Sequence, residues 1–366
     1  MSKAAELAAL IGGQKALGDK NFIINGGFQV WQRGTTADTA TTGDYMCDRF
    51  LVGFSGLDGN VDWDQETSTP DGHNYALKVS TDASESSLDA GDFLRVEQRF
   101  EGQNLQLLQK GTSSAKSVTL SFWVKSSVAS TYTVALEDRD TSSFREISKS
   151  YVINSANTWE HKTVTFEGDT VGALDNDNAY SLGLYFWIDA GSTYTSGTFS
   201  TAWQARDTDE RVYDTTGWLV STSPQFYLTG IQLEVGDVAT AFEHEDYGTP
   251  LRKCQRYYFR TNYNADNNYF GAGGVYSTTQ AMVMLPLPVE MRAALTALDQ
   301  SGTAAHYGSW GNGATQVCSA VPAIRGSSSK TTCAIDLTFS SLNSATGTYV
   351  YRIVDASGYL GVYAEL

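Results

Sequence analysis

Apolar and polar residues alternate in short runs along most of the chain from Lys20 onward. A period of two places successive side chains on opposite faces of a β-strand, so each run predicts a strand with one face toward a core. Clusters of Ser, Gly, Asn and Asp separate the runs and favour turns. The clearest runs before residue 250 are 118–125, 131–137, 162–166, 181–188 and 225–233. This alternation predicts an all-β fold, arranged as a meander or Greek-key sandwich.

Residues 3–17 follow a different period. Four apolar residues recur at the i, i+3, i+4, i+7 spacing of one helix face, namely Ala4, Leu7, Ala8 and Ile11. A lone helix of about 15 residues is marginal in water, so its apolar stripe needs another surface. We therefore expect residues 1–18 to form an anchor helix that docks into a larger assembly or bundles with copies of itself. The anchoring side chains would be Leu7, Leu10 and Ile11. The alternative is a frayed tail that rests on its own domain.

The charge distribution changes near residue 250. Residues 1–250 hold 17 Lys and Arg against 35 Asp and Glu, and residues 251–366 hold 8 against 6. The formal net charge of −16 therefore comes from the first part, which also holds seven of the eight Trp. This shift predicts two domains with separate surfaces, over 19–250 and 251–366. The second part has its own short apolar or alternating runs, which predict a smaller sandwich, at 255–260, 281–285, 332–339, 349–353 and 358–366.

The excess of acidic residues also argues against some classes of binding partner. A net charge of −16 argues against nucleic acid and against an anionic membrane surface, because both attract basic proteins. No run reaches the roughly 20 apolar residues that span a bilayer, and the first residues lack the pattern of a signal peptide. We expect no membrane insertion, and synthesis in a cytoplasm. Cys47, Cys254, Cys318 and Cys333 should then be free, mostly buried thiols, although a Cys318–Cys333 bridge is conceivable on paired strands.

Catalytic patterns are missing from the sequence. The four histidines, His73, His161, His244 and His306, are scattered, and no His-x-x-x-His or Gly-x-Ser-x-Gly motif occurs. The 41 carboxylates supply many chance pairs of the kind that hydrolyse glycosidic bonds, but spacing alone cannot select a pair. We predict a protein that is not an enzyme.

Several segments carry a family resemblance. Asn21–Gly34 reads Asn-Phe-Ile-Ile-Asn-Gly-Gly-Phe-Gln-Val-Trp-Gln-Arg-Gly, and Gly230–Gly236 reads Gly-Ile-Gln-Leu-Glu-Val-Gly. Cys-Gln-Arg-Tyr-Tyr follows at Cys254–Tyr258, and a Tyr-x-x-Asp-Arg-aromatic element stands at Tyr45–Phe50. Together they resemble bacteriophage tail-fibre and appendage proteins, which open and close a carbohydrate-binding-module-like jelly-roll domain with such segments. Pro286–Arg292 resembles a segment of the C-terminal sandwich in the same proteins.

The resemblance implies an anchor helix over 1–18, a jelly roll over 19–250 and a C-terminal β-sandwich over 251–366, assembled as a homotrimer. It implies a structural protein of the virion, assembled in the host cytoplasm. As a tail fibre or receptor-binding appendage, it would attach the particle to a host surface glycan or protein, and its other partners would be tail or capsid proteins. Two alternatives stay open. One is a head fibre or capsid decoration protein held by the N-terminal helix, and the other is a glycan-degrading fibre enzyme.

Aromatic residues in polar, turn-rich stretches are the candidates for contact with a sugar, because a ring can stack on the apolar face of a pyranose. The candidates are Trp63, Tyr75, Trp203 and Trp218 in the first domain and Tyr269 and Trp310 in the second. The alternative for each Trp in a loop is packing at the rim of its sandwich, since large aromatics dominate small cores. Trp123 and Trp187 lie inside period-two runs and are assigned to the core.

Two further assignments concern carboxylates. Asp175 and Asp177 could offer oxygens to a structural calcium ion, which related carbohydrate-binding modules often carry, and no other cofactor is expected. The stretch lacks the Gly and Glu of an EF-hand loop, so a turn is the simpler explanation. A carboxylate recurs at the position of Glu234 in the resembling proteins, which implies that it ties the closing strand to neighbouring backbone or to a side chain such as Arg33. The alternative is that Glu234 lies exposed on the outer face of the strand. We assign Trp31–Gly34 and Gly230–Gly236 to the framework rather than to a ligand site.

Overall fold

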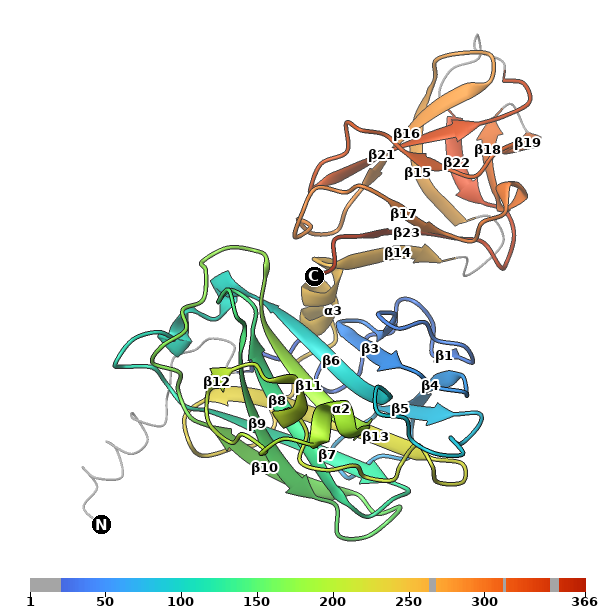
Figure 1. Cartoon of the computed structure of the whole chain (residues 1–366). Coiled ribbons are helices and arrows are strands. Elements are labelled where there is room, and N and C mark those ends of the chain that lie inside the picture. The colour runs from blue at the N-terminus through green and yellow to red at the C-terminus, as the bar shows by residue number, and fades with distance from the viewer. Residues whose placement is uncertain (1–20, 263–267, 312–313, 343–348) are drawn as a thin grey trace.

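The computed structural model describes residues 21–262, 268–311, 314–342 and 349–366. The expected anchor helix over 1–18, with Leu7, Leu10 and Ile11, lies outside the described residues. The described chain is all-β, as the alternation predicts, and it forms two β-sandwiches that follow each other along the sequence (Figure 1). The predicted runs between residues 118 and 233 are strands whose ends fall within two residues of the expected ones.

The first domain is a jelly-roll β-sandwich of two antiparallel sheets. The order along the six-stranded sheet is β1 (Thr36–Ala37), β4 (Val61–Glu66), β5 (Ala76–Thr81), β13 (Gln225–Val235), β7 (Val118–Ser126) and β10 (Glu160–Phe166). The order along the seven-stranded sheet is β12 (Gln204–Ala205), β9 (Arg145–Val152), β8 (Thr131–Asp138), β11 (Tyr180–Ala190), β6 (Phe93–Glu101), β3 (Phe50–Ser55) and β2 (Tyr45–Cys47).

Strand β7 shows how the sequence builds this sandwich. Its even-numbered residues from Val118 to Val124 face the other sheet, and Phe122 meets Phe186 of β11 with 5.0 Å between ring centroids. The alternate residues point outward, so Trp123 is half-buried on the outer face of the six-stranded sheet. Its assignment to the core was wrong, because a period of two serves both faces of a strand and only register identifies the inner one.

Trp187 is buried, with 1% of its surface exposed, but it also lies on an outer face. On β11 it alternates with the core residues Phe186 and Ile188 and packs with Phe93 and Tyr194 in a separate apolar cluster. Residues 192–213 cover this cluster, with short helices at α2 (Ser192–Thr195) and η3 (Thr208–Glu210). The connecting segment therefore covers the part of the outer face around Trp187.

The second domain has a separate apolar core, built from residues 270–364. A three-stranded sheet holds β14 (Tyr258–Asn262), β23 (Tyr359–Tyr363) and β17 (Leu298–Gln300). A seven-stranded sheet holds β19 (Ala314–Val317), β18 (Tyr307–Gly311), β22 (Tyr349–Ile353), β15 (Asn268–Val275), β16 (Gln280–Pro286), β21 (Thr332–Thr338) and β20 (Ala323–Ile324).

A helix that the sequence pattern did not predict, α3 (Gly248–Gln255), lies between the two sandwiches (Figure 1). The Asp246 carboxylate caps it by accepting from Gly248 N at 3.0 Å and from the Thr249 hydroxyl at 2.9 Å. Pro250 then fits the first turn, where no N–H is needed. The strand expected over 255–260 is displaced as a result and begins at Tyr258.

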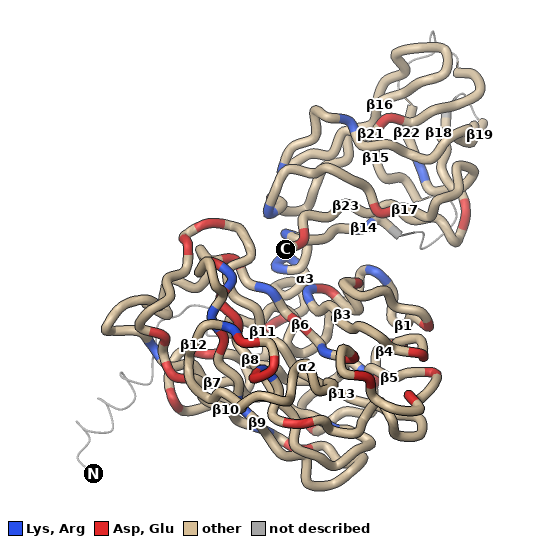
Figure 2. Tube along the Cα trace, viewed as in Figure 1, with Lys and Arg blue, Asp and Glu red and all other residues tan. Residues whose placement is uncertain are grey.

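Figure 2 shows Asp and Glu gathered on the first domain, as the counts along the sequence require. The four cysteines are all free and buried, as expected. Burial raises the pKa of each of these thiols, which keeps them protonated and unreactive. None of the helices in the described part of the chain is long and apolar enough to cross a membrane.

Candidate functional site

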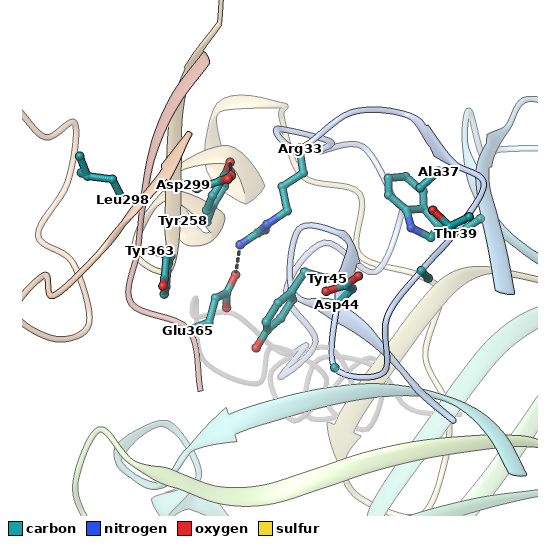
Figure 3. Close-up of a pocket in the computed structure, with 13 residues that line it drawn as sticks. Arg33, Ala37, Thr39, Asp44, Tyr45, Tyr258, Leu298, Asp299, Tyr363 and Glu365 are labelled. Atoms are coloured by element: carbon teal, nitrogen blue, oxygen red, sulfur yellow. Dashed lines mark hydrogen bonds and ion pairs between the residues drawn. The ribbon is translucent and has the colours of Figure 1, made fainter. Parts of the chain in front are cut away.

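Three of the segments that carry the family resemblance, Asn21–Gly34, Tyr45–Phe50 and Cys254–Tyr258, meet where the two domains join. Figure 3 shows Arg33 reaching from the first domain to Glu365 of the second, with 3.0 Å between Nη2 and Oε1. Arg49 pairs with the other oxygen of the same carboxylate and is almost fully buried, with 1% of its side chain exposed. Each guanidinium also lies over a tyrosine ring, Arg33 at 3.5 Å from the centroid of Tyr258 and Arg49 at 3.6 Å from that of Tyr257.

Further polar contacts fasten this joint. The Gln32 amide donates to Asp48 Oδ1 at 2.5 Å and to the carbonyl oxygen of Tyr258 at 2.7 Å. Arg256 forms a two-pronged pair with Glu101, at 2.9 and 2.7 Å. The contacts of Gln32 with Tyr258 and of Arg256 with Glu101 cross between the domains, so they hold the two sandwiches in one arrangement.

A cleft of about 530 Å³ opens beside the joint, and we call it the joint cleft (Figure 3). Its lining includes Arg33, Tyr45, Trp63, Tyr258, Asp299, Tyr363 and Glu365. Most of its polar groups already have partners: Arg33 is paired with Glu365, and the Tyr258 hydroxyl donates to Asp299 Oδ2 at 2.5 Å. The Tyr45 hydroxyl donates to a main-chain oxygen of Leu366 at 3.3 Å. Nη1 of Arg33 is buried there without a hydrogen-bond partner among the described residues.

A second cleft, of about 580 Å³, lies on the other side of a tryptophan pair. Trp63 borders the joint cleft, and its ring stacks on that of Trp31, with centroids 5.8 Å apart, while Trp31 borders the second cleft. We call the second one the amide cleft. Its lining residues are Gln29, Trp31, Gln65, Asn74, Tyr75, Glu245 and Tyr247.

A tight turn in the first motif aims two residues into the amide cleft. The Asn25 side chain accepts from the backbone N–H groups of Gln29 at 2.9 Å and Val30 at 3.0 Å. Asn25 and Phe28 adopt positive φ angles of 65° and 51°, a conformation that asparagine tolerates better than most residues. The Trp31 indole N–H donates to the Phe28 carbonyl at 2.6 Å, which fixes the ring. Gln29 and Trp31 therefore point to one side of a clamped turn.

The other lining residues come from two more segments. Gln65 lies on β4, and Asn74 and Tyr75 precede β5, which pairs with β4. The Tyr75 carbonyl accepts from the Thr229 hydroxyl at 2.7 Å. Glu245 and Tyr247 precede α3, and Glu245 is held by Lys253 of that helix at 2.6 Å. Tyr247 is 56% exposed, so its ring is accessible from solvent.

The amide cleft differs from the joint cleft in the state of its polar groups. Within the described part of the chain, no hydrogen bond involves the side-chain amides of Gln29, Gln65 or Asn74. Each amide offers both a donor and an acceptor. Three aromatic rings and three amides without protein partners thus line one open cleft, a composition that can stack on an apolar face and bond to hydroxyl groups.

The four aromatic residues of the first domain that were predicted to contact a sugar lie in different environments. Tyr75 lines the amide cleft, whereas Trp63 is 5% exposed and reaches only the joint cleft. Trp203 lines neither cleft: its indole N–H donates to the Glu167 carbonyl at 2.7 Å. The prediction that Trp218 contacts a ligand was wrong, because this residue is fully buried in the first core. The turn-rich sequence around Trp218 is a local pattern, whereas the burial of its side chain depends on the sheets that pack over it.

Tyr269 and Trp310 come together on the outer face of the seven-stranded sheet in the second domain. Tyr269 is paired across strands with Arg352, whose guanidinium lies 4.9 Å from the Trp310 ring centroid. The two aromatic residues are 56% and 38% exposed. They therefore form a small exposed surface that is separate from the amide cleft.

Sequence reasoning missed most of the amide cleft. It assigned Trp31 to the framework and did not consider Gln29, Gln65, Asn74, Glu245 or Tyr247. Two signals were available: Gln29 and Trp31, and likewise Glu245 and Tyr247, are two residues apart, a spacing that places side chains on one side of an extended segment. No sequence pattern shows that these two segments meet.

Asp175 and Asp177 lie in a turn. Asp177 Oδ1 accepts from the Ala179 N–H at 2.8 Å, and Asp175 N donates to Asp140 at 2.8 Å. Within the described residues, no group of three His, Cys, Asp or Glu side chains is arranged to hold a metal ion. Glu234 accepts from the N–H of Thr240 at 2.7 Å, so it ties the closing strand to neighbouring backbone, while Arg33 pairs with Glu365 instead.

Comparisons with known proteins give weak likenesses. No protein-family model matches the sequence, and no curated protein matches it. Among solved structures, a family 4 carbohydrate-binding module has a TM-score of 0.31 and 13% identity, over 58% of this chain and 98% of that one. The xylan-binding domain of family 22 from Paenibacillus barcinonensis has a TM-score of 0.27 and 17% identity, over 50% of this chain and 91% of that one.

The enzymatically active domain of tailspike protein 4 from bacteriophage CBA120 is also similar, with a TM-score of 0.31 and 12% identity. That match covers 59% of this chain but only 22% of the tailspike chain. Likenesses at these scores identify neither a ligand nor an activity for this protein.

Proposed function

We propose that this protein binds a glycan in the amide cleft and attaches a virus particle to its host. The observation that carries the glycan proposal is the lining itself: Trp31, Tyr75 and Tyr247 beside three side-chain amides that have no partner within the described residues. Aromatic rings hold the apolar face of a sugar, and amides pair with its hydroxyl groups in both directions. Sugar hydroxyls would also find a fixed acceptor in Glu245, which Lys253 orients.

Binding without hydrolysis is part of the proposal. Glycosidases of the common type use two carboxyl groups that flank the scissile bond. The amide cleft contains one carboxylate, Glu245, and it is paired with Lys253 at 2.6 Å. A sugar in this cleft would therefore meet one acid where hydrolysis needs two.

The virion role rests on the motif resemblance rather than on the cleft. Under this proposal the chain is a tail fibre or receptor-binding appendage, assembled as a homotrimer, and the motif residues lock its two domains together. The alternative is a head fibre or capsid decoration protein. Two rigidly joined sandwiches are compatible with a place on the tail and with a place on the capsid.

Variants of the amide cleft should weaken glycan binding. Tyr247→Ala and Tyr75→Ala each remove one ring, and we expect roughly tenfold weaker binding from either, which corresponds to about 1.4 kcal/mol of lost stacking. The measurement is affinity electrophoresis of the full chain in gels that contain neutral polysaccharides or purified host surface glycan. Tyr213→Ala is the matched control, because Tyr213 is 51% exposed and lies outside both clefts.

Two results would contradict this proposal. One is binding that is equal in the wild type and in both cleft variants. The other is an absence of binding to every glycan tested. Release of new reducing ends during the same incubation would instead indicate hydrolysis and favour the enzyme alternative.

Removal of residues 1–18 should distinguish a tail appendage from a head fibre or capsid decoration protein. We expect the truncated chain to lose binding to purified tails if it is a tail appendage, and to lose binding to purified capsids if it is a head fibre, because the apolar stripe of Leu7, Leu10 and Ile11 would be the docking surface. Glycan binding should be unchanged by the truncation. Retained binding to both tails and capsids would refute the anchor.

A further inference from the structure

Three of the four histidines converge on the outer face of the six-stranded sheet, although they are far apart in the sequence. The His161 ring centroid lies 5.2 Å from that of Trp123, and the His73 centroid lies 5.6 Å from that of His244. The Phe242 ring contacts both His73 and His244, at 5.1 and 5.0 Å. We call these five residues the histidine face.

A glycine in β13 joins the two halves of this face. Gly230 has a φ of +59° at an irregularity in the pairing of β13 with β7. A Cβ atom there would lie 2.5 Å from Cε1 of His73 and 3.2 Å from Cδ1 of Trp123. Both rings therefore pack over this one position, which only a residue without a side chain leaves open. The face runs from His161 across Trp123 and Gly230 to His73 and His244.

Strand pairing continues the face with more aromatic surface and a cation. Lys125 is the next outward residue after Trp123 on β7 and lies opposite Tyr227 of β13. Its Nζ is 3.9 Å from the Tyr227 ring centroid and 5.1 Å from that of Trp159. No carboxylate forms an ion pair with Lys125 among the described residues. Aromatic rings and basic side chains thus alternate along the outer face of the six-stranded sheet.

Among the described residues, no carboxylate is an ion-pair partner of His73 or His161. Glu66 of β4 acts on Lys125, and no carboxylate contributes to the titration of His73 or His161. Three neighbouring carboxylates form ion pairs, Asp64 with Lys78, Glu160 with Lys162 and Glu245 with Lys253, and Glu234 accepts a hydrogen bond from Thr240. Glu243 and Glu245 flank His244 in the chain.

We propose that the histidine face binds an acidic polysaccharide, one that carries uronate carboxylates, and that this binding tightens as the pH falls and the histidines gain protons. This inference rests on the proposed function of glycan binding and adds a second site with its own ligand class. Rings of Trp123 and Phe242 supply stacking, neutral histidine accepts and donates hydrogen bonds, and protonated histidine attracts a carboxylate.

The direction of the pH effect follows from linkage. Burial, followed by the nearby His244 and His161, lowers the pKa of His73, and burial lowers that of His161. These rings are therefore mostly neutral near neutral pH and become charged below their usual range. A bound carboxylate favours the protonated form, so by reciprocity protonation must favour carboxylate binding. Affinity should rise as the pH falls.

A uronate polymer fits this face better than nucleic acid does. Residues 1–250 hold 17 basic and 35 acidic residues, a formal charge of −18 that repels any polyanion, so a ligand here needs attractive contacts beyond its charge. A uronate polymer also offers hydroxyl groups and apolar sugar faces between its charges, which match a surface where aromatic rings separate the cations.

The test uses the full chain, polygalacturonate as the acidic probe and a neutral β-glucan as the comparison. Binding to polygalacturonate should be at least roughly tenfold tighter near pH 5 than near pH 7.5, because the pKa values of His73 and His161 are lowered by burial and these rings gain charge only as the solution becomes acidic. The double variant His161→Gln and His244→Gln alters the two most exposed rings and should lose this pH dependence. The matched control His306→Gln should keep it, since His306 lies in the second domain, bonded to Ser301 at 2.8 Å.

Equal affinity at the two pH values would overturn the inference, as would a pH dependence that survives in the double variant. Binding of a single-stranded oligonucleotide with the same pH dependence would overturn the choice of ligand class. The amide cleft is judged separately, by whether Tyr75→Ala and Tyr247→Ala weaken binding of the neutral glucan. A failure of one site therefore remains distinguishable from a failure of the other.

Discussion

Replacing Glu365 with alanine is expected to lower the free energy of unfolding by about 3–5 kcal/mol, because the change leaves a buried guanidinium without its counter-charge. The carboxylate pairs with both Arg33 and Arg49, and the Arg49 side chain is 1% exposed. Arg49 would keep one hydrogen bond, to the Arg99 carbonyl at 2.6 Å. Chemical denaturation monitored by tryptophan fluorescence measures the loss, since Trp31 and Trp63 lie next to the joint.

The matched control is Glu290→Ala. Glu290 also belongs to the second domain, but its side chain is 62% exposed and lies 3.9 Å from Lys330, so we expect a change below about 0.5 kcal/mol. If the joint holds both domains as one cooperative unit, Glu365→Ala should also separate their unfolding into two transitions. A loss of stability no larger than that of the control would show that the joint is not a stabilising contact.

The sequence predicted the strands well because each strand carries its own signal. Leu120, Phe122 and Val124 alternate with polar residues, and this local pattern needs no partner to be recognised. It does not reveal which strand lies beside β7, which is β13 from more than a hundred residues away. The helix α3 was missed for another reason: its start depends on the Asp246 cap and Pro250 rather than on apolar periodicity.

The candidate sites were harder to predict because both are made by contacts between distant segments. The amide cleft joins Trp31, Tyr75 and Tyr247, which only the folded sandwich brings together. The histidines looked scattered because His73, His161 and His244 come from two loops and a strand. Their convergence depends on the pairing of β10 with β7 and on the space above Gly230, and neither is visible in a single sequence.

Burial divided the aromatic candidates in a way that composition could not. Trp187 would be an exposed ring on the outer face of its sheet if residues 192–213 did not cover it. That cover is fastened by Arg211, which bridges the buried carboxylates of Glu137 and Glu146 at 2.7 Å each. The outer face of the seven-stranded sheet is thereby covered around Trp187, whereas the amide cleft and the histidine face stay open.

Arg211→Met should therefore cost about 3–5 kcal/mol of unfolding free energy near pH 8, because two carboxylates that are 1% and 6% exposed lose their shared cation. Burial and the neighbouring Glu137 already raise the pKa of Glu146 to about 7, and without the Arg211 cation the folded-state pKa of this carboxyl would rise further above its unfolded value.

The penalty is thus present above the raised pKa and disappears as the pH falls toward about 3, where the carboxyls of the unfolded chain are also protonated. We expect the deficit, measured by urea denaturation at each pH, to shrink to about 1–2 kcal/mol there, the range for lost hydrogen bonds. Arg139→Met is the matched control, since Arg139 also pairs with Glu137 but is 30% exposed. It should cost about 1 kcal/mol or less, because water can replace an exposed partner. A deficit for Arg211→Met that is equal at both pH values would show that packing, rather than charge, is what Arg211 contributes.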